Sequence, residues 1–135
     1  MHNIEDLKQV NFPKFDQKDS FLVVYESGKA VPFQVSRLFI IKAEEACNRG
    51  AHAHKACTQL FSVLQGSCTV TCDDGESQKS FVLDSAAVGL WVPPTLWASQ
   101  VYQAGTILMV LTDQSYDEAD YIRQYDEFLD FRKKV

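Results

Sequence analysis

Two histidines, His52 and His54, stand two residues apart in a segment that predicts a β-strand. Side chains at this spacing project to the same face of a strand, so both imidazoles are expected to enter one cavity. Histidine takes up and returns protons near neutral pH. Such a pair could move a proton between adjacent carbons of a keto sugar through an enediolate, with a nearby donor stabilising the oxyanion. One histidine would be the base, and the other would orient it or supply the second proton. The alternative is that one or both are hydrogen-bonded core residues.

A metal centre is the competing use of two imidazoles. A catalytic metal site needs at least three protein ligands, usually histidine or carboxylate. The third histidine, His2, lies at the N-terminus, and position 59, where a ligand acid is expected, carries the neutral amide of Gln59. We therefore predict neither a metal nor another cofactor. The cysteines are predicted to be free, buried thiols, with two of them on one face of a strand. They are Cys47, Cys57, Cys68 and Cys72, and the pair is Cys68 and Cys72.

Four further residues are candidates for substrate binding. Arg49 precedes the histidine pair, and a guanidinium can grip a phosphate bidentately. Trp97 could stack on a base or a sugar. Gln59 and Lys55 complete the set. Each has a structural alternative: a solvated loop arginine for Arg49, a core position for Trp97 and a solvated strand position for Lys55.

Length and charge restrict the classes of partner. The chain has 135 residues, of which 46% are hydrophobic, and this predicts a single domain over 1–135 with a core of its own. A net charge of -5 excludes a phosphate-rich nucleic acid as partner, although a few arginines can still hold one diphosphate. Charged residues interrupt the first ten positions, and no run approaches the roughly 20 apolar residues of a membrane span. A cytoplasmic protein without a membrane partner is expected.

Strand patterns dominate from residue 21 to residue 111. Asp73, Asp74, Gly75 and Glu76 predict a tight hairpin. The apolar run 37–41 predicts a buried strand, and 43–50 predicts a loop. The tail 117–134 has apolar residues at three- and four-residue steps, which predicts an amphipathic helix or two short turns. The predicted strands are 21–25, 31–33, 37–41, one through the histidine pair, 59–64, 67–72, 80–83, 89–92, 97–101 and 106–111. Short, evenly spaced strands indicate an all-β sandwich or barrel.

The segment from Gly50 through the two histidines to Gln59 and Gly66 resembles the first cupin motif, and 89–97 resembles the second. This resemblance implies a cupin-type jelly-roll β-barrel with a short C-terminal helical segment. The match becomes closer in R-G-A-H-A-H-K at 49–55, in G-L-W-V-P-P-T-L-W at 89–97 and in Y-D-E-A-D-Y-I-R-Q-Y-D-E-F at 116–128. V-P-F at 31–33, R-L-F at 37–39 and D-D-G at 73–75 also fit in order. Together they resemble the sugar 3,4-ketoisomerases, or WxcM-like family, over nearly the whole chain.

The resemblance implies an isomerase that moves the keto group of dTDP-4-keto-6-deoxyglucose from C4 to C3 without a metal. It implies a homodimer that exchanges an N-terminal strand, and a product used in dTDP-aminosugar biosynthesis for surface polysaccharide such as lipopolysaccharide O-antigen. His52 and His54 carry over as the catalytic pair and Arg49 as the motif arginine. The chain departs from the family pattern at Phe39 and Ile40, where tyrosines are usual, at Ala98, where a polar residue is usual, and at 16–21, which lacks a glycine.

Three alternatives from other classes remain open. A cupin that binds a sugar nucleotide without turnover would explain the missing tyrosine, but not the retention of both histidines. A related dTDP-sugar epimerase would need a His–Asp pair with a tyrosine acid, and the sequence places no aspartate beside His52 or His54. A metal-dependent cupin oxygenase is opposed by the ligand count.

Overall fold

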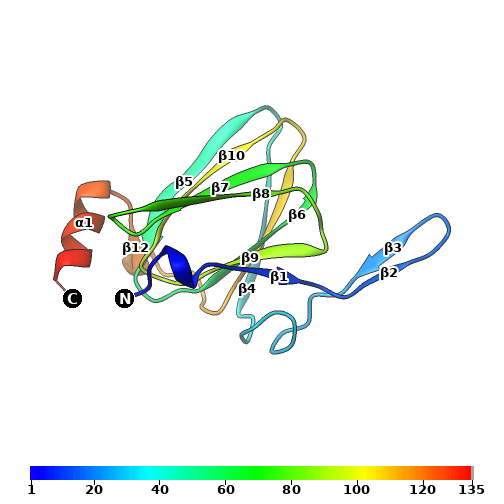
Figure 1. The fold of residues 1–135 in the computed structure, drawn as a ribbon, viewed down its shortest axis with the longest axis horizontal. Coiled ribbons are helices and arrows are strands. Elements are labelled where there is room, and N and C mark those ends of the chain that lie inside the picture. The colour runs from blue at the N-terminus through cyan, green and yellow to red at the C-terminus, as the bar shows by residue number, and fades with distance from the viewer. Residues whose placement is uncertain (135) are drawn as a thin grey trace.

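The computed structural model describes residues 1–134 and has two five-stranded antiparallel sheets that face each other (Figure 1). The first sheet has the order β1 (Lys8–Asn11), β9 (Val88–Val92), β6 (Gln59–Gln65), β11 (Ile107–Thr112), β4 (Arg37–Lys42). The second has the order β12 (Tyr121–Ile122), β5 (Cys47–His54), β10 (Trp97–Tyr102), β7 (Cys68–Asp73), β8 (Gln78–Leu83). The remaining elements are the hairpin β2 (Lys14–Asp16) and β3 (Phe21–Val23), the short helices η1 (Ile4–Asp6) and η2 (Glu118–Asp120), and α1 (Tyr125–Lys133). The predicted all-β jelly-roll barrel with a short C-terminal helical segment is confirmed, in the form of two facing antiparallel sheets.

Apolar side chains from both sheets meet in the main core. Phe61, Val63 and Leu108 come from the first sheet and pack with Val70 and Leu83 of the second. Residues at every second position of a strand share a face, so each strand contributes one side to this layer. Cys68 and Cys72 also lie in it, as the four-residue spacing predicts. All four cysteines are free; Cys57 is buried as predicted, whereas Cys47 is exposed at the start of β5. Burying one such side chain stabilises the fold by about 1.5 to 3 kcal/mol.

The hairpin predicted at 73–76 is confirmed. It joins β7 to β8, and the Asp74 carboxylate accepts hydrogen bonds from the backbone N–H groups of Glu76 and Ser77 at 2.9 and 2.8 Å. Gly75 takes a φ of 91°, the left-handed conformation for which glycine is suited.

The C-terminal segment is only partly helical. Helix α1 packs against one end of the second sheet, at β12 and β5 (Figure 1), where Phe128 is fully buried against Ala53 and Ile122. The prediction of a helix or two turns over 117–134 missed β12, which pairs with β5 and sets Tyr121 opposite His54. Local periodicity cannot reveal such a pairing, because it joins segments far apart in sequence.

The N-terminal third departs most from the expectations. The run 37–41 is not a buried strand: β4 lies at an edge of its sheet, and Leu38 and Ile40 are each 55% exposed. The expected loop 43–50 is mostly strand, because β5 begins at Cys47. Segment 31–33 makes only an isolated bridge between Ser27 and Val31. Strands β1 and β2 were not predicted.

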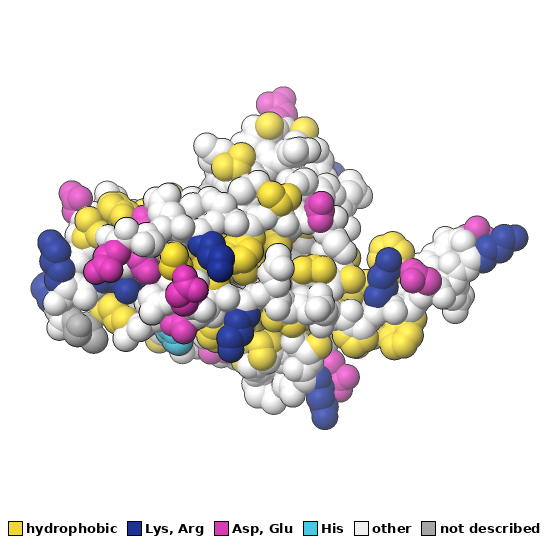
Figure 2. Space-filling model, in the orientation of Figure 1, with side chains coloured by type: hydrophobic (Ala, Val, Ile, Leu, Met, Phe, Trp, Pro, Cys, Tyr) yellow, Lys and Arg dark blue, Asp and Glu magenta, His cyan; other side chains and the backbone are white. Residues whose placement is uncertain are grey.

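The hairpin β2–β3 projects from the body of the molecule (Figures 1 and 2). It exposes three large apolar side chains, Phe15, Phe21 and Leu22, at 57 to 59%. Within residues 1–134 no helix has both the length and the apolar composition that a membrane crossing requires.

Candidate active site

A cavity of about 340 Å³ opens between the two sheets, beside the main core. Strands β4, β6 and β11 contribute mainly apolar residues to it, while β5, β10 and the segment around β12 contribute polar ones. Its polar lining consists of three arginines, two glutamines, one histidine and one tyrosine. These are Arg37, Arg49, Arg123, Gln59, Gln100, His52 and Tyr121. A cationic pocket of this size suits an anionic ligand such as a nucleoside diphosphate sugar bound by its charged part.

A β-bulge places two of these residues on the same wall. Along β10, Gln100 pairs with Arg49 and Ser99 with Gly50, whereas Ala98 pairs with His52. Ala51 is therefore the extra residue; Gly50 and Ala51 have φ values of 85° and 53°. In an uninterrupted strand, positions 49 and 52 would face opposite sides. The bulge restores them to one face, so Arg49 and His52 both line the cavity.

The two histidines lie together, as their spacing predicts. Their ring centroids are 5.1 Å apart, with the rings nearly perpendicular. Burial lowers the pKa of His52 to about 4, and the neighbouring His54 adds to this shift. His52 is therefore a neutral imidazole near pH 7 and is able to accept a proton.

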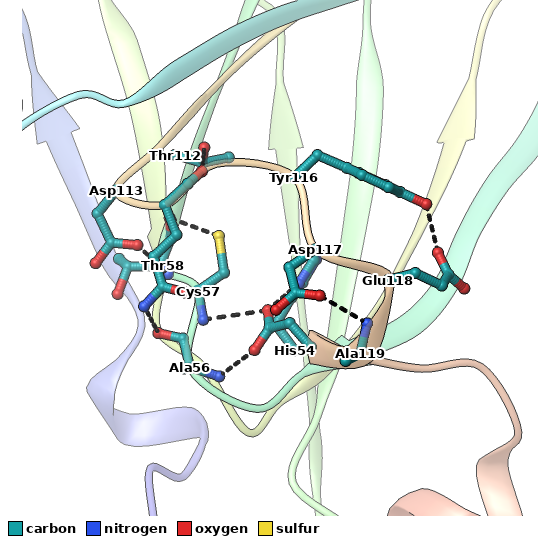
Figure 3. A network of polar contacts seen from close by, with 12 residues as sticks. His54, Ala56, Cys57, Thr58, Thr112, Asp113, Tyr116, Asp117, Glu118 and Ala119 are labelled. Atoms are coloured by element: carbon teal, nitrogen blue, oxygen red, sulfur yellow. Dashed lines mark hydrogen bonds and ion pairs between the residues drawn. The ribbon is translucent and has the colours of Figure 1, made fainter.

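His54 is paired with a carboxylate. Its Nδ1 lies 2.8 Å from Oδ2 of Asp120, at the end of η2, and both side chains are more than 90% buried. The same carboxylate accepts hydrogen bonds from the backbone N–H groups of Ala56 at 2.7 Å and Cys57 at 3.4 Å (Figure 3). The inference that no aspartate lies beside the histidine pair was therefore wrong, because Asp120 is 66 residues away in sequence and reaches His54 only through the fold.

The pairing fixes the protonation pattern of the His54 ring. A carboxylate accepts a hydrogen bond, so Nδ1 carries the proton and Nε2 carries the lone pair. Nε2 is buried, and no polar atom of residues 1–134 bonds to it. Burial lowers the pKa of His54, while the hydrogen bond to Asp120 acts in the opposite direction. His54 does not line the main cavity, whereas His52 does.

Tyr121 lies against both imidazoles, with ring centroids 5.0 Å from His52 and 4.4 Å from His54. The guanidinium of Arg123 lies 4.3 Å from the centre of the Tyr121 ring. Arg123 in turn donates two hydrogen bonds to Glu118, at 2.6 and 2.8 Å, which hold the pKa of Glu118 at about 2. Glu118 also accepts the hydroxyl of Tyr116 (Figure 3).

One group of residues in the described chain has the ligand types of a metal site. Donor atoms of His54, Cys57 and Asp120 lie within 4.8 Å of one another. The 2.8 Å between His54 and Asp120 is a hydrogen-bond distance, shorter than the roughly 3.3 Å that separates two ligands bound tetrahedrally at about 2.0 Å from zinc. Burial also raises the pKa of the Cys57 thiol to about 11, which disfavours the thiolate that a metal needs. The arrangement fits a hydrogen-bonded pair better than a metal centre.

The structure brings some of the predicted residues together and separates others. Arg49 and Gln59 line the cavity with His52. Trp97 does not: it pairs with Ala53 on the opposite face of the second sheet and packs under α1. Lys55 follows the end of β5 and lines a separate surface pocket near α1. The strand alternation that turns His52 and Ala98 inward turns Trp97 outward.

Five residues were missed by reasoning from the sequence. They are Arg37, Gln100, Asp120, Tyr121 and Arg123. Asp120, Tyr121 and Arg123 come from one short stretch, D-Y-I-R, in the tail that was expected to be helical. The signal that could have found them was its mixture of an acid, a phenol and a base. The amphipathic helix predicted for this stretch gave no reason to place these residues beside the histidines.

Comparison with known proteins agrees with this geometry. The family model described as "FdtA: WxcM-like, C-terminal" matches residues 5–133. A TDP-4-oxo-6-deoxy-alpha-D-glucose-3,4-oxoisomerase from Aneurinibacillus thermoaerophilus is 42% identical over 132 residues, covering 95% of this chain and 94% of the relative.

Solved structures of similar proteins extend the comparison. The 3,4-ketoisomerase QdtA from Thermoanaerobacterium thermosaccharolyticum, in a variant complexed with TDP-4-keto-6-deoxyglucose, has a TM-score of 0.92 at 29% identity and covers 98% of this chain and 97% of that one. A 3,4-ketoisomerase from Helicobacter canadensis has a TM-score of 0.91 at 34% identity, with coverage of 95% and 98%. A dTDP-4-dehydrorhamnose 3,5-epimerase from Bacillus anthracis, at 21% identity and a TM-score of 0.76, shares the fold alone. The chain belongs to the FdtA, or WxcM-like, family of cupin-type dTDP-sugar 3,4-ketoisomerases.

Proposed function

We propose that the chain converts TDP-4-keto-6-deoxyglucose into its 3-keto isomer, by proton transfer at His52 and without a metal. The observation that carries the proposal is a neutral imidazole on the wall of a cavity that three arginines also line. The full-length similarity to an oxoisomerase of the same substrate supports it. Relatives bind TDP and TDP-4-keto-6-deoxyglucose.

In this mechanism His52 is the base. A neutral imidazole removes the proton at C3, and the carbonyl at C4 accepts the electron pair to give an enediolate. The imidazolium then returns a proton to C4. His54, held by Asp120, lies behind His52 and keeps a fixed ring orientation.

The arginines of the cavity supply the binding energy for the nucleotide. We expect Arg49 and Arg37 to contact the diphosphate, because neither makes an ion pair with a carboxylate in the described chain, whereas Arg123 is held by Glu118. Gln59 and Gln100 offer amide groups to sugar hydroxyls. Trp97 and Lys55 lie outside this cavity, so we expect neither of them to contact a ligand bound in it.

A second candidate is the related epimerase, which the His54–Asp120 pair and the nearby Tyr121 favour. The histidine that carries the carboxylate is not the one that lines the cavity, however. This separation supports the ketoisomerase over the epimerase.

The proposal includes a homodimer that exchanges its N-terminal strand. The projecting hairpin exposes Phe15, Phe21 and Leu22, and the outer side of the edge strand β4 exposes Leu38 and Ile40. Apolar surfaces of this kind are costly in water unless a partner covers them. Sedimentation of the wild type should give a dimer, and Leu22→Glu should shift it towards the monomer. A monomeric wild type would contradict this part of the proposal.

The deciding experiment is an NMR assay on TDP-4-keto-6-deoxyglucose in deuterated water with a chelator present. The expected product is the 3-keto sugar, with deuterium at C4 in the molecules whose His52 imidazolium exchanges its proton with the solvent before the return step. The 3-keto group suits a later amination on the way to a surface aminosugar. His52→Asn and His54→Asn should fold normally and lose most turnover. Deuterium at C5 would indicate the epimerase. TDP binding with an unchanged sugar would indicate a binding module.

A further inference from the structure

The 3,4-isomerisation requires a second proton movement that His52 does not provide. Besides the proton that passes from C3 to C4, one proton must leave the C3 hydroxyl and one must arrive at the C4 oxygen. A single group that both donates and accepts can do this if it lies beside the two oxygens. We propose that Tyr121 is this group, and the inference rests on the proposed ketoisomerase activity.

Tyr121 is the one phenol among the residues that line the cavity. It stands on β12 directly opposite His54, so its ring shares the inner face with both imidazoles. On the facing strand β4, Phe39 and Ile41 turn towards the cavity, and neither has a proton to donate. A phenol for the reacting oxygens therefore has to come from the β12 side.

The hydroxyl of Tyr121 is available for a ligand. The chain has five tyrosines, and the hydroxyls of the other four are hydrogen-bonded within the protein. These bonds are Tyr25 to the Ala86 carbonyl, Tyr102 to Gln100, Tyr116 to Glu118 and Tyr125 to Asp73. Tyr121 makes no such bond to residues 1–134.

The ring of Tyr121 is held in place by its neighbours. The Arg123 guanidinium packs on it at 4.3 Å, and the bidentate bond to Glu118 fixes the guanidinium. A cation on an aromatic face is attracted by the electron-rich ring, and this favours one ring position. Glu118 and Arg123 are thus positioning residues for the phenol.

The protons and electrons balance in two steps. First, His52 takes the C3 proton, the C3–H electron pair becomes the C3=C4 bond, and the C4 oxygen takes the proton of Tyr121. Second, the phenolate takes the proton of the C3 hydroxyl, the C3=O bond forms, and the C3=C4 pair takes the proton from the His52 imidazolium at C4. Both residues return to their starting state, and no oxidant or reductant is needed.

The test is Tyr121→Phe, which keeps the ring contacts and removes only the hydroxyl. The matched control is Tyr125→Phe, because that hydroxyl bonds Asp73 outside the cavity. Tyr121→Phe should lower kcat by about 100-fold or more, the usual contribution of general acid–base catalysis. KM and the Kd for TDP should stay within about threefold of the wild type, since the hydroxyl is assigned no part in nucleotide binding. Tyr125→Phe should keep the wild-type kcat.

Each outcome has a defined meaning. An active wild type with an equally active Tyr121→Phe would overturn the role of Tyr121 and leave the proposed function intact. Loss of TDP binding together with kcat would overturn it as well, because Tyr121 would then support the scaffold. A wild type that leaves the keto sugar unchanged would overturn the proposed function, and with it the inference.

Discussion

The bulge at Gly50 makes a prediction that links backbone conformation to the site. In Gly50→Ala, the new Cβ would lie 2.7 Å from the Gln100 side-chain oxygen, and φ is 85°. A left-handed φ costs alanine about 1 to 2 kcal/mol. About 0.4 to 1 kcal/mol of this is recovered, because alanine has less conformational entropy than glycine in the unfolded chain. Displacing the buried amide of Gln100 adds about 1 to 3 kcal/mol if its polar atoms lose their partners.

Gly105→Ala provides the matched control. Gly105 has nearly the same φ, 84°, but no heavy atom lies within 4 Å of the point where an alanine Cβ would stand. It should lose only about 1 kcal/mol, the net cost of the backbone conformation. Gly50→Ala should lose about 2 to 4 kcal/mol when the steric displacement is included.

Thermal unfolding at one fixed protein concentration measures this difference. An unfolding entropy of about 2.1 cal/mol/K per residue converts 1 kcal/mol into roughly 3.5 °C for a chain of 135 residues. Tm should therefore fall by about 3 to 4 °C in Gly105→Ala and by about 7 to 14 °C in Gly50→Ala. Because the bulge aims Arg49 and His52 into the cavity, Gly50→Ala should also lower kcat/KM by about tenfold or more, a loss typical of small misplacements.

Equal Tm losses in the two variants, with full activity in Gly50→Ala, would refute this reasoning. The bulge would then tolerate a side chain, and the contact with Gln100 would carry no energetic weight.

Three further predictions concern the residues of the site. Asp120→Ala should destabilise the fold by about 2 to 4 kcal/mol in a denaturant titration, because it leaves the ring N–H of His54 and the backbone N–H of Ala56 unpaired. Asp117→Ala removes only an exposed helix cap and should cost about 1 kcal/mol in the same titration. Equal losses in the two variants would argue against a buried His54–Asp120 pair. Because the pKa of His52 is about 4 in the fold and near 6.5 when unfolded, the unfolded state binds more protons between these values, so stability should fall as pH drops from about 6.5 towards 4. Tm measured across that range should fall less steeply in His52→Asn, and an unaltered slope would assign the decline to other groups. Arg49→Ala should raise KM more than it lowers kcat in steady-state assays, and an unchanged KM would place Arg49 in the scaffold.

Sequence reasoning worked where the signal is local. The two-residue spacing of His52 and His54 predicts one shared face, and their rings meet at 5.1 Å. The aspartate and glycine residues at 73–75 predict the hairpin between β7 and β8, and the structure has it. In each case neighbouring residues fix the geometry through strand alternation or turn conformation.

Sequence reasoning failed where the burial of a side chain depends on which strands and layers lie next to it. The apolar run at 37–41 gives no sign that β4 is an edge strand, so Leu38 and Ile40 were expected inside and lie 55% exposed. The same limit applies to Trp97, whose face follows from its register with Ala53 on β5.

The sequence by itself determined the all-β class, the histidine pair and the resemblance that led to the family. Only the tertiary structure decided which groups surround that pair. Asp120 and Tyr121 reach the histidines because β12 pairs with β5, and Arg49 joins His52 because the bulge adds one residue. Strand pairing and register are set by contacts between distant segments, so no local pattern of residue types specifies them.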